Sequence, residues 1–309
     1  MKLLKSILAL FMAVGLTACS TQTGNEEPAA SAEPIKVLAP MGAPALSLLG
    51  LYGNENVTID TVDGSDVIRA ELAKADSEYD AIIAPINLGA TLLSKGKSEF
   101  LLDSAVTWGN LYIVGTDENA LESEGVFAAF GEQSVPQKVL ESSMDLESLP
   151  LEVTYFGSAN EVQAQLLTGK ANVGMLAEPA ATATIAKAKE KGLELKIIKD
   201  LQEAYKEQNN MDQVGYPQAA LFVKKGSEEK VASYIEEASD FVENATDETI
   251  AKAVETATVE KLGVPSAEIV QKTWERQNIH FKKAADIKTD IDTFLKQFSI
   301  TLTEEAYSK

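Results

Sequence analysis

Short apolar runs alternate with amphipathic stretches along most of this chain, and that alternation constrains the fold more than any other feature. The runs at 57–62 and 151–156, for example, have the length of strands, and each is followed by residues with helical spacing. Parallel strands connected by crossover helices produce this order. The sequence therefore predicts an α/β fold with doubly wound, mostly parallel sheets and a helical C-terminal region.

The predicted elements follow one another with few gaps. Strands are predicted at 35–38, 57–62, 79–84, 125–130, 151–156, 171–176, 193–198 and 218–224, with a long apolar run at 105–115. Helices are predicted at 44–51, 66–75, 87–94, 135–142, 160–167 and 179–191. Beyond Ser227 the chain is predicted to be helical almost throughout, at 228–244, 247–262, 266–277 and 286–298.

This order predicts two lobes. The run at 105–115 is expected to lead out of the first lobe, and the strand at 218–224 is expected to return to it. The first lobe is then formed by 35–112 and 218–309, and the second by 113–217. The two crossover segments between them are expected to form a hinge.

Composition excludes several classes of function. The net charge of −20 repels nucleic acids and anionic membrane surfaces, so neither is an expected partner. Cys19 and His280 are the only cysteine and the only histidine. A Ser-His-Asp triad or a histidine-rich zinc site would depend on that single ring, which argues against an enzyme and against metal capture. We expect no cofactor and no metal.

The first residues form a separate segment. Lys2 and Lys5 precede an apolar run at 7–15, which is shorter than the roughly 20 residues that span a bilayer, and Leu-Thr-Ala-Cys follows at 16–19. This segment resembles a bacterial lipoprotein signal peptide. The resemblance implies that 1–18 are removed, that Cys19 carries a lipid, and that the protein is anchored outside the cytoplasmic membrane. An ordinary secretory signal and a single anchoring helix are the alternatives. Residues 19–34, polar and proline-containing, are expected to be a tether.

Four loop motifs carry a second resemblance. They are Pro40-Met41-Gly42-Ala43-Pro44, the strand-to-loop sequence at 79–85, its counterpart at 173–179, and Arg-Gln-Asn-Ile-His-Phe at 276–281. Together they resemble the solute-binding lipoproteins of ABC importers, of the nitrate/sulfonate/taurine and pyrimidine-precursor type, over about 35–300. The resemblance implies a two-lobed type II periplasmic-binding fold. It further implies a monomer that captures a sulfonate or a small nitrogenous or aromatic compound and delivers it to an ABC permease.

Open α/β sheets bind ligands beyond the carboxyl ends of their strands, where helix N-termini offer free N–H groups. Met41, Gly42 and Ala43 follow the first predicted strand, and the small Gly42 and Ala43 favour close approach of a ligand to the backbone, although a plain turn would have the same sequence. Asn87 follows the third predicted strand. It is expected either to bind ligand or to cap its helix.

The second lobe contributes its own candidates. Ser134 and Ser158 precede predicted helices, and Asn160 lies in the first turn after Ser158. Each is a ligand-binding candidate, with helix capping as the alternative. Glu178 ends a predicted strand and is expected to bind an N–H-bearing ligand or to interact with a helix dipole.

Further candidates lie near the expected hinge and in the C-terminal motif. Trp108 and Tyr216 fall on the two crossover segments, where an aromatic ring can stack on a planar ligand or pack in the hinge. Arg276 is expected to face the cleft or to pair with an acid. His280 alternates with apolar neighbours, so we expect it to be packed.

Capture for import remains the leading hypothesis from sequence. A sensor or adhesion lipoprotein without transport is an alternative that the residues do not distinguish from it. An extracytoplasmic enzyme is a third hypothesis, which the shortage of histidine and cysteine disfavours.

Overall fold

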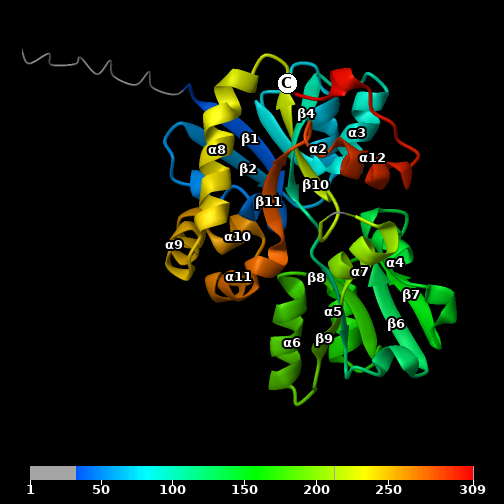
Figure 1. Ribbon diagram of the computed structural model, residues 1–309. Coiled ribbons are helices and arrows are strands. Elements are labelled where there is room, and N and C mark those ends of the chain that lie inside the picture. The colour runs from blue at the N-terminus through cyan, green and yellow to red at the C-terminus, as the bar shows by residue number, and fades with distance from the viewer. Residues whose placement is uncertain (1–32, 212, 309) are drawn as a thin grey trace, which may run out of the picture. The chain divides into compact units, whose positions relative to one another are not determined.

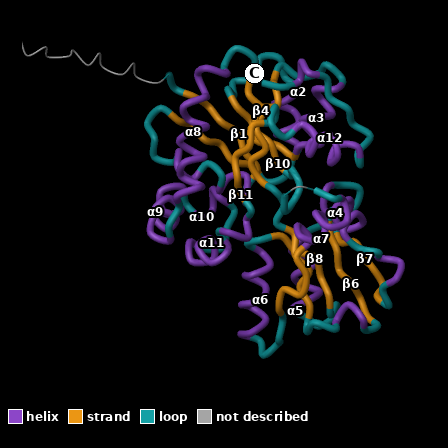
Figure 2. Tube along the Cα trace, in the orientation of Figure 1, coloured by secondary structure: helices purple, strands orange, loops and turns teal. Residues whose placement is uncertain are grey.

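The structure, a computed structural model, describes residues 33–211 and 213–308. The expected signal peptide, the lipidation site Cys19 and the tether as far as residue 32 lie outside the described residues. The described chain contains two sheets (Figures 1 and 2). None of its helices within these ranges has the length and hydropathy needed to cross a bilayer.

The first sheet has six strands, and four of them run in the same direction. Their order is β11 (Ile279–Lys283), β4 (Phe100–Thr107), β10 (Ala219–Lys224), β3 (Ala81–Pro85), β1 (Ile35–Pro40) and β2 (Val57–Val62), with β10 and β11 reversed. Helix α8 (Glu228–Asn244) packs on one face, and α2 (Asp66–Ala73), α3 (Ile86–Ser94) and α12 (Lys288–Lys296) pack on the other (Figure 1). The remaining helices of this lobe are α1 (Ala43–Leu46), α9 (Asp247–Ala257), α10 (Val259–Leu262) and α11 (Ala267–Thr273).

The second sheet has five strands, and only one of them is reversed. Their order is β7 (Leu151–Phe156), β6 (Gly125–Phe130), β8 (Val173–Ala177), β5 (Leu111–Gly115) and β9 (Lys196–Asp200), with β5 reversed. Helices α5 (Ala159–Leu167) and α6 (Ala180–Glu190) cover one face, and α4 (Val135–Ser143) and α7 (Leu201–Asn209) cover the other. The prediction of an α/β fold with mostly parallel sheets is confirmed.

Two crossover segments join the sheets, at 108–110 and at 210–218. The run at 105–115, which was expected to lead out of the first lobe, consists of the end of β4, a turn, and β5 in the other sheet. Gly109 makes the turn at φ 87°, and a Cβ there would lie 2.6 Å from the Tyr216 ring, so only glycine fits.

Three further differences from the predicted elements have local causes. The sequence missed α7, which begins where the Asp200 carboxylate accepts the N–H groups of Gln202 and Glu203. It also missed β11, a strand with two lysines that pairs irregularly with β4. The helix predicted at 247–262 is interrupted at Thr258, whose φ of 74° ends α9 and whose side chain caps α10.

An aromatic cluster joins the second crossover segment to helices of both lobes. Tyr216, on the crossover, stacks on Phe294 of α12 with ring centroids 5.4 Å apart, and Tyr205 of α7 lies 5.0 Å from Tyr216. Such pairs contribute about 1 kcal/mol each beyond their burial. The cluster therefore holds the crossover in a defined place beside both sheets.

Asp80, which precedes β3, forms hydrogen bonds that connect this strand to β1 and to α8. Its carboxylate accepts the N–H of Lys36 in β1 (2.9 Å), the hydroxyl of Ser227 (3.1 Å) and the ammonium of Lys230 in α8 (2.9 Å). Partial burial disfavours the charged form, but these donors outweigh that effect and lower the pKa of Asp80.

Asp80→Asn is expected to destabilise the protein by about 1 kcal/mol at pH 7. Because the folded-state pKa is lowered, the stabilisation by the carboxylate is present above the unfolded-state pKa and is lost as the pH falls through the folded-state value. The free energy of unfolding of the wild type and the variant, measured in urea from pH 7 to pH 3, should therefore converge in acid. A gap that stays constant would contradict the ionic origin of the effect.

Candidate functional site

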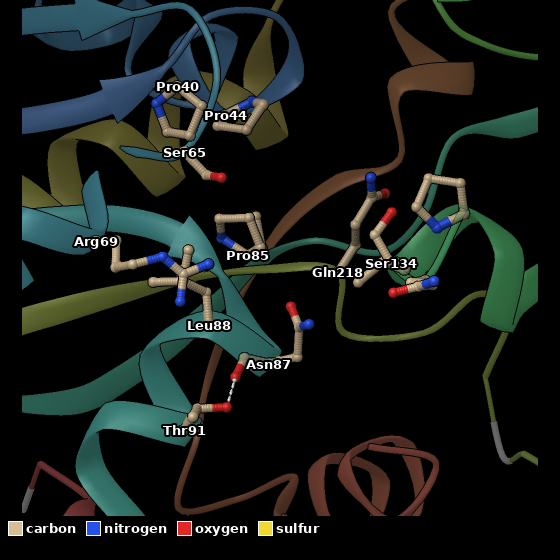
Figure 3. Close-up of a pocket in the computed structure, with 14 residues that line it drawn as sticks. Pro40, Pro44, Ser65, Arg69, Pro85, Asn87, Leu88, Thr91, Ser134 and Gln218 are labelled. Atoms are coloured by element: carbon tan, nitrogen blue, oxygen red, sulfur yellow. Dashed lines mark hydrogen bonds between the residues drawn. The ribbon is translucent and has the colours of Figure 1, made fainter. Parts of the chain in front are cut away.

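A cavity of about 420 Å³ opens beyond the carboxyl ends of β1 and β3 (Figure 3). Pro40 and Pro85 end those strands, and residues at the beginning of α2, α3 and β10 also line it. The second lobe contributes the beginning of α4, from Gln133 to Pro136. The cavity is therefore bounded by both lobes and lies where an open α/β sheet binds its ligands.

The charge of this cavity is opposite to that of the chain. Arg69 of α2 lines it, and none of the fourteen lining residues is an aspartate or a glutamate. Within the described part of the chain no acid forms an ion pair with Arg69. The protein as a whole carries a net charge of −20, so an acid-free wall with an available guanidinium is a local exception. An anion is the ligand that such a wall attracts.

Two helix N-termini reinforce this preference. Helix α3 begins at Ile86 and α4 at Val135, and residues at both beginnings line the cavity. The first N–H groups of a helix have no partner within it, and the helix dipole adds a partial positive charge there. In these two helices the N–H of Ile86 donates to Gln218 O and Pro136 has none, so the N–H groups that follow them are the ones available. Ser134 leaves this end of α4 open, since its hydroxyl donates to Gly131 O (2.7 Å) and makes no cap.

Two side-chain amides in the cavity lack hydrogen-bond partners. Asn87 Oδ1 and Gln218 Oε1 are both buried, and neither accepts a hydrogen bond from any described residue. A buried polar atom without a partner costs about 1–3 kcal/mol, so such atoms indicate a missing partner. In Figure 3 the Asn87 side chain extends from the beginning of α3, and the Gln218 and Ser134 side chains lie together on the other side. Both amides therefore have unused hydrogen-bonding capacity beside the cavity.

Apart from Ser65, Thr91 and Gln133, the rest of the wall is apolar, and much of it is rigid. Pro40, Pro44, Pro85 and Pro136 all line the cavity, together with Leu88 and Val135. Proline rings have a fixed φ, so little conformational freedom is lost when a ligand packs against them. The arrangement suits a small molecule with one charged polar group and an apolar part.

Solved structures resemble most of the chain, although no protein-family model and no curated protein matches it. An ABC transporter structure from Parabacteroides distasonis superposes with a TM-score of 0.72 at 23% identity, over 86% of this chain and 92% of that one. The chain has the fold of ABC-transporter solute-binding proteins.

Other structures with this solute-binding-protein fold are more distant. The periplasmic aliphatic sulphonate binding protein SsuA from Escherichia coli has a TM-score of 0.57 at 14% identity, covering 87% of this chain and 88% of that one. The periplasmic nitrate-binding protein NrtA from Synechocystis has a TM-score of 0.55 at 13% identity, over 86% and 81%. These likenesses establish the fold and do not identify this chain's ligand.

Of the residues predicted from sequence, the solute-binding-protein fold places Asn87 and Ser134 in the cavity wall. Met41, Gly42 and Ala43 form the turn between the lining residues Pro40 and Pro44 but do not line the cavity themselves. The N–H of Gly42 donates to Leu262 O (2.8 Å), and the Met41 side chain packs beside Gly263.

Trp108 and Tyr216 are buried in the crossover packing and do not line the cavity. Trp108 donates its indole N–H to His280 O (3.0 Å), and its ring lies under the Lys282 ammonium. His280 itself is exposed rather than packed, contrary to the sequence prediction, because β11 is an edge strand. Partial burial, then the neighbouring Lys282, lowers the pKa of His280.

Glu178 and Arg276 bind each other across the two lobes. Arg276 Nε donates to Glu178 Oε1 (2.8 Å), and Thr182 at the start of α6 bonds to both side chains. The Glu178 side chain is fully buried, while that of Arg276 is 40% exposed. Both charges are thus satisfied without a ligand, away from the cavity.

Ser158 and Asn160 lie at the beginning of α5 and do not line the cavity. The Ser158 hydroxyl accepts the N–H of Glu161 (3.3 Å), which is the capping role that the sequence left open. Asn160 Oδ1 accepts a hydrogen bond from Gln163.

Sequence reasoning missed Arg69, Ser65, Thr91 and Gln218 as lining residues. Ser65 is the N-cap residue of α2, and Arg69 follows it by one helical turn on the same face. Placing Ser65 beside the cavity would therefore have indicated Arg69 as well. Among residues 33–211 and 213–308, no three acidic, histidine or cysteine side chains are grouped as a metal site requires.

Proposed function

We propose that this chain is the solute-binding protein of an ABC importer and that its ligand is a small organic anion. The observation that carries the proposal is the cavity between the lobes, which contains Arg69, two helix N-termini and no carboxylate in a chain of net charge −20. A carboxylate or sulfonate group would bind Arg69 and the N–H groups, and its apolar part would pack on the prolines.

The mechanism requires binding and movement but no chemical step. The two lobes, one built on each sheet, would close about the crossover segments, bringing the start of α4 onto a ligand held at α3. Closure would exclude water and strengthen the electrostatic contacts. Cys19 would carry the lipid that keeps the protein at the outer face of the membrane, where an ABC permease receives the ligand.

A thermal-shift panel tests the ligand class. We expect ethanesulfonate, taurine, acetate or succinate to raise the melting temperature by several degrees at 100 times the dissociation constant. Thymine and the polyamines putrescine and spermidine should have no effect. The measurement should be repeated at 0.5 M NaCl, where the shift by an anion should shrink because salt screens its attraction to Arg69. Stabilisation by the polyamines alone would contradict an anion site.

A further inference from the structure

Three of the fourteen residues that line the cavity carry primary amides, namely Asn87, Gln133 and Gln218. Within the described part of the chain, each of them forms hydrogen bonds only through its backbone groups. Asn87 Oδ1 and Gln218 Oε1 are also buried, so bulk water does not supply the missing donor there. The three amides are therefore polar side chains that remain available to a ligand.

The backbone places two of these amides in one fixed frame. Gln218 O accepts the N–H of Ile86 (3.0 Å), the residue that precedes Asn87 at the beginning of α3. Ala219, which follows Gln218, pairs with Pro85 in the first sheet. Asn87 and Gln218 therefore keep their places relative to each other, and little backbone freedom is lost when one ligand binds to both.

A pair of amides recognises a group that both donates and accepts hydrogen bonds. Each primary amide carries two N–H donors and one acceptor oxygen, and half a turn of its terminal torsion exchanges their places. A carboxamide or ureido group has both functions, so it can donate to the amide oxygens and accept from the amide nitrogens. An ionised carboxylate only accepts and an alkyl group does neither, so both leave the oxygens of Asn87 and Gln218 without a donor.

Arg69 determines the charge of the ligand. It is the only ionised residue of the wall, so it balances one anionic group and leaves a second one without a counter-ion. In the view of Figure 3, the Asn87 side chain lies between those of Arg69 and Gln218, so a ligand bound to Arg69 would extend toward the two amides. We propose that the ligand is a small monoanion whose other end bears a carboxamide or ureido group. This inference rests on the proposed function of the cavity.

The test compares acids that differ only in the group at the far end. Calorimetric titration of the purified protein uses succinamate and the longer glutaramate, each beside three acids of the same length: its methyl ketone, its branched alkanoate and its diacid. For succinamate these are levulinate, isocaproate and succinate. We expect the better of the two amides to bind about tenfold more tightly than each of its three analogues, because the analogues leave buried amides without partners.

Three variants, each first shown to melt cooperatively, locate the preference. Asn87→Leu and Gln218→Met keep the approximate side-chain shape and remove one amide each, so the preference for the amide over its branched alkanoate should fall from about tenfold to about threefold. Gln277→Met is the matched control, because Gln277 Oε1 is also buried without a partner but the residue does not line the cavity. This variant should keep the full preference.

The outcomes separate the ligand class from capture itself. Equal affinity for the amides and their analogues, tighter binding of the diacids, or binding of only the anions in the thermal-shift panel would overturn the amide class while leaving anion capture intact. A preference that survives in both Asn87→Leu and Gln218→Met would overturn the assignment to these two side chains. Failure of the parent protein to bind any of these acids or any anion of the thermal-shift panel would overturn the proposed anion function and this inference with it.

Discussion

Arg69→Glu is expected to weaken anion binding by about 100-fold, the largest effect of any single substitution in the cavity. Arg69 is the only ionised residue of the wall, and it forms no ion pair within the described part of the chain. A hydrogen bond between charged groups contributes about 1.5–3 kcal/mol, and the substitution removes it and adds a like charge. Calorimetric titration of the variant with the anion that stabilises the wild type would measure the loss.

Matched variants distinguish a direct contact between Arg69 and the ligand from an effect of the protein's overall electrostatic potential. Lys95→Glu makes the same charge change at the end of α3, on an exposed residue that does not line the cavity, and should leave affinity within about twofold. Arg69→Lys keeps the charge but lacks the planar guanidinium, which can donate two parallel hydrogen bonds to one anionic group. An intermediate loss of affinity is therefore expected. Equal losses in Arg69→Glu and Lys95→Glu would refute a direct role for Arg69.

Most of the fold follows from local sequence signals, because strand length and apolar periodicity are local properties. The ranges 57–62, 125–130 and 151–156 were predicted with the observed ends, and so was the helix at 228–244. What the sequence could not supply was the tertiary context. The apolar run at 105–115 was expected to lead out of the first lobe, but its apolar pattern alone does not mark where one strand ends and the next begins. β11 is a strand because β4 offers it an edge.

The candidate site was predicted less completely for a related reason. Strand ends and helix caps identify loops that reach the carboxyl edge of a sheet, and this found Asn87 and Ser134. The same rule selected Ser158, although α5 starts outside the cavity. Arg69 lies within a helix and Gln218 on a crossover segment, so no strand-end signal marks either of them. Glu178 and Arg276 were separate candidates, because their pairing across 98 residues is visible only in the folded chain.

The second prediction with a large effect concerns that pair. Arg276→Met is expected to destabilise the protein by about 2 kcal/mol, lowering the melting temperature by about 4 °C. The change leaves the fully buried Glu178 carboxylate with only Thr182 as a donor. The usual cost of breaking a buried pair is larger, but the Arg276 side chain is 40% exposed and solvent already screens it. Thermal and urea melts would measure the loss.

A double variant tests whether the uncompensated carboxylate is the cause. Glu178→Gln should cost less than Arg276→Met, because water can solvate the exposed guanidinium that remains. Adding Glu178→Gln to Arg276→Met removes the buried charge, so the double variant should be more stable than Arg276→Met alone. If the two losses simply add, the buried charge does not account for the effect.

Lys283→Met is a control for the Glu178–Arg276 pair, because it breaks an ion pair that lies within one lobe rather than between the two. Lys283 is also half-exposed and binds a buried carboxylate, that of Asp103 (3.1 Å), but both residues belong to the first sheet. Lys283→Met and Arg276→Met should therefore lose similar amounts of stability. Only Arg276→Met should change the radius of gyration of the ligand-free protein, because Glu178 ends β8 of the second sheet while Arg276 precedes β11 of the first. A change of equal size in Lys283→Met would show that the radius reports loosening within a lobe rather than the bond between lobes.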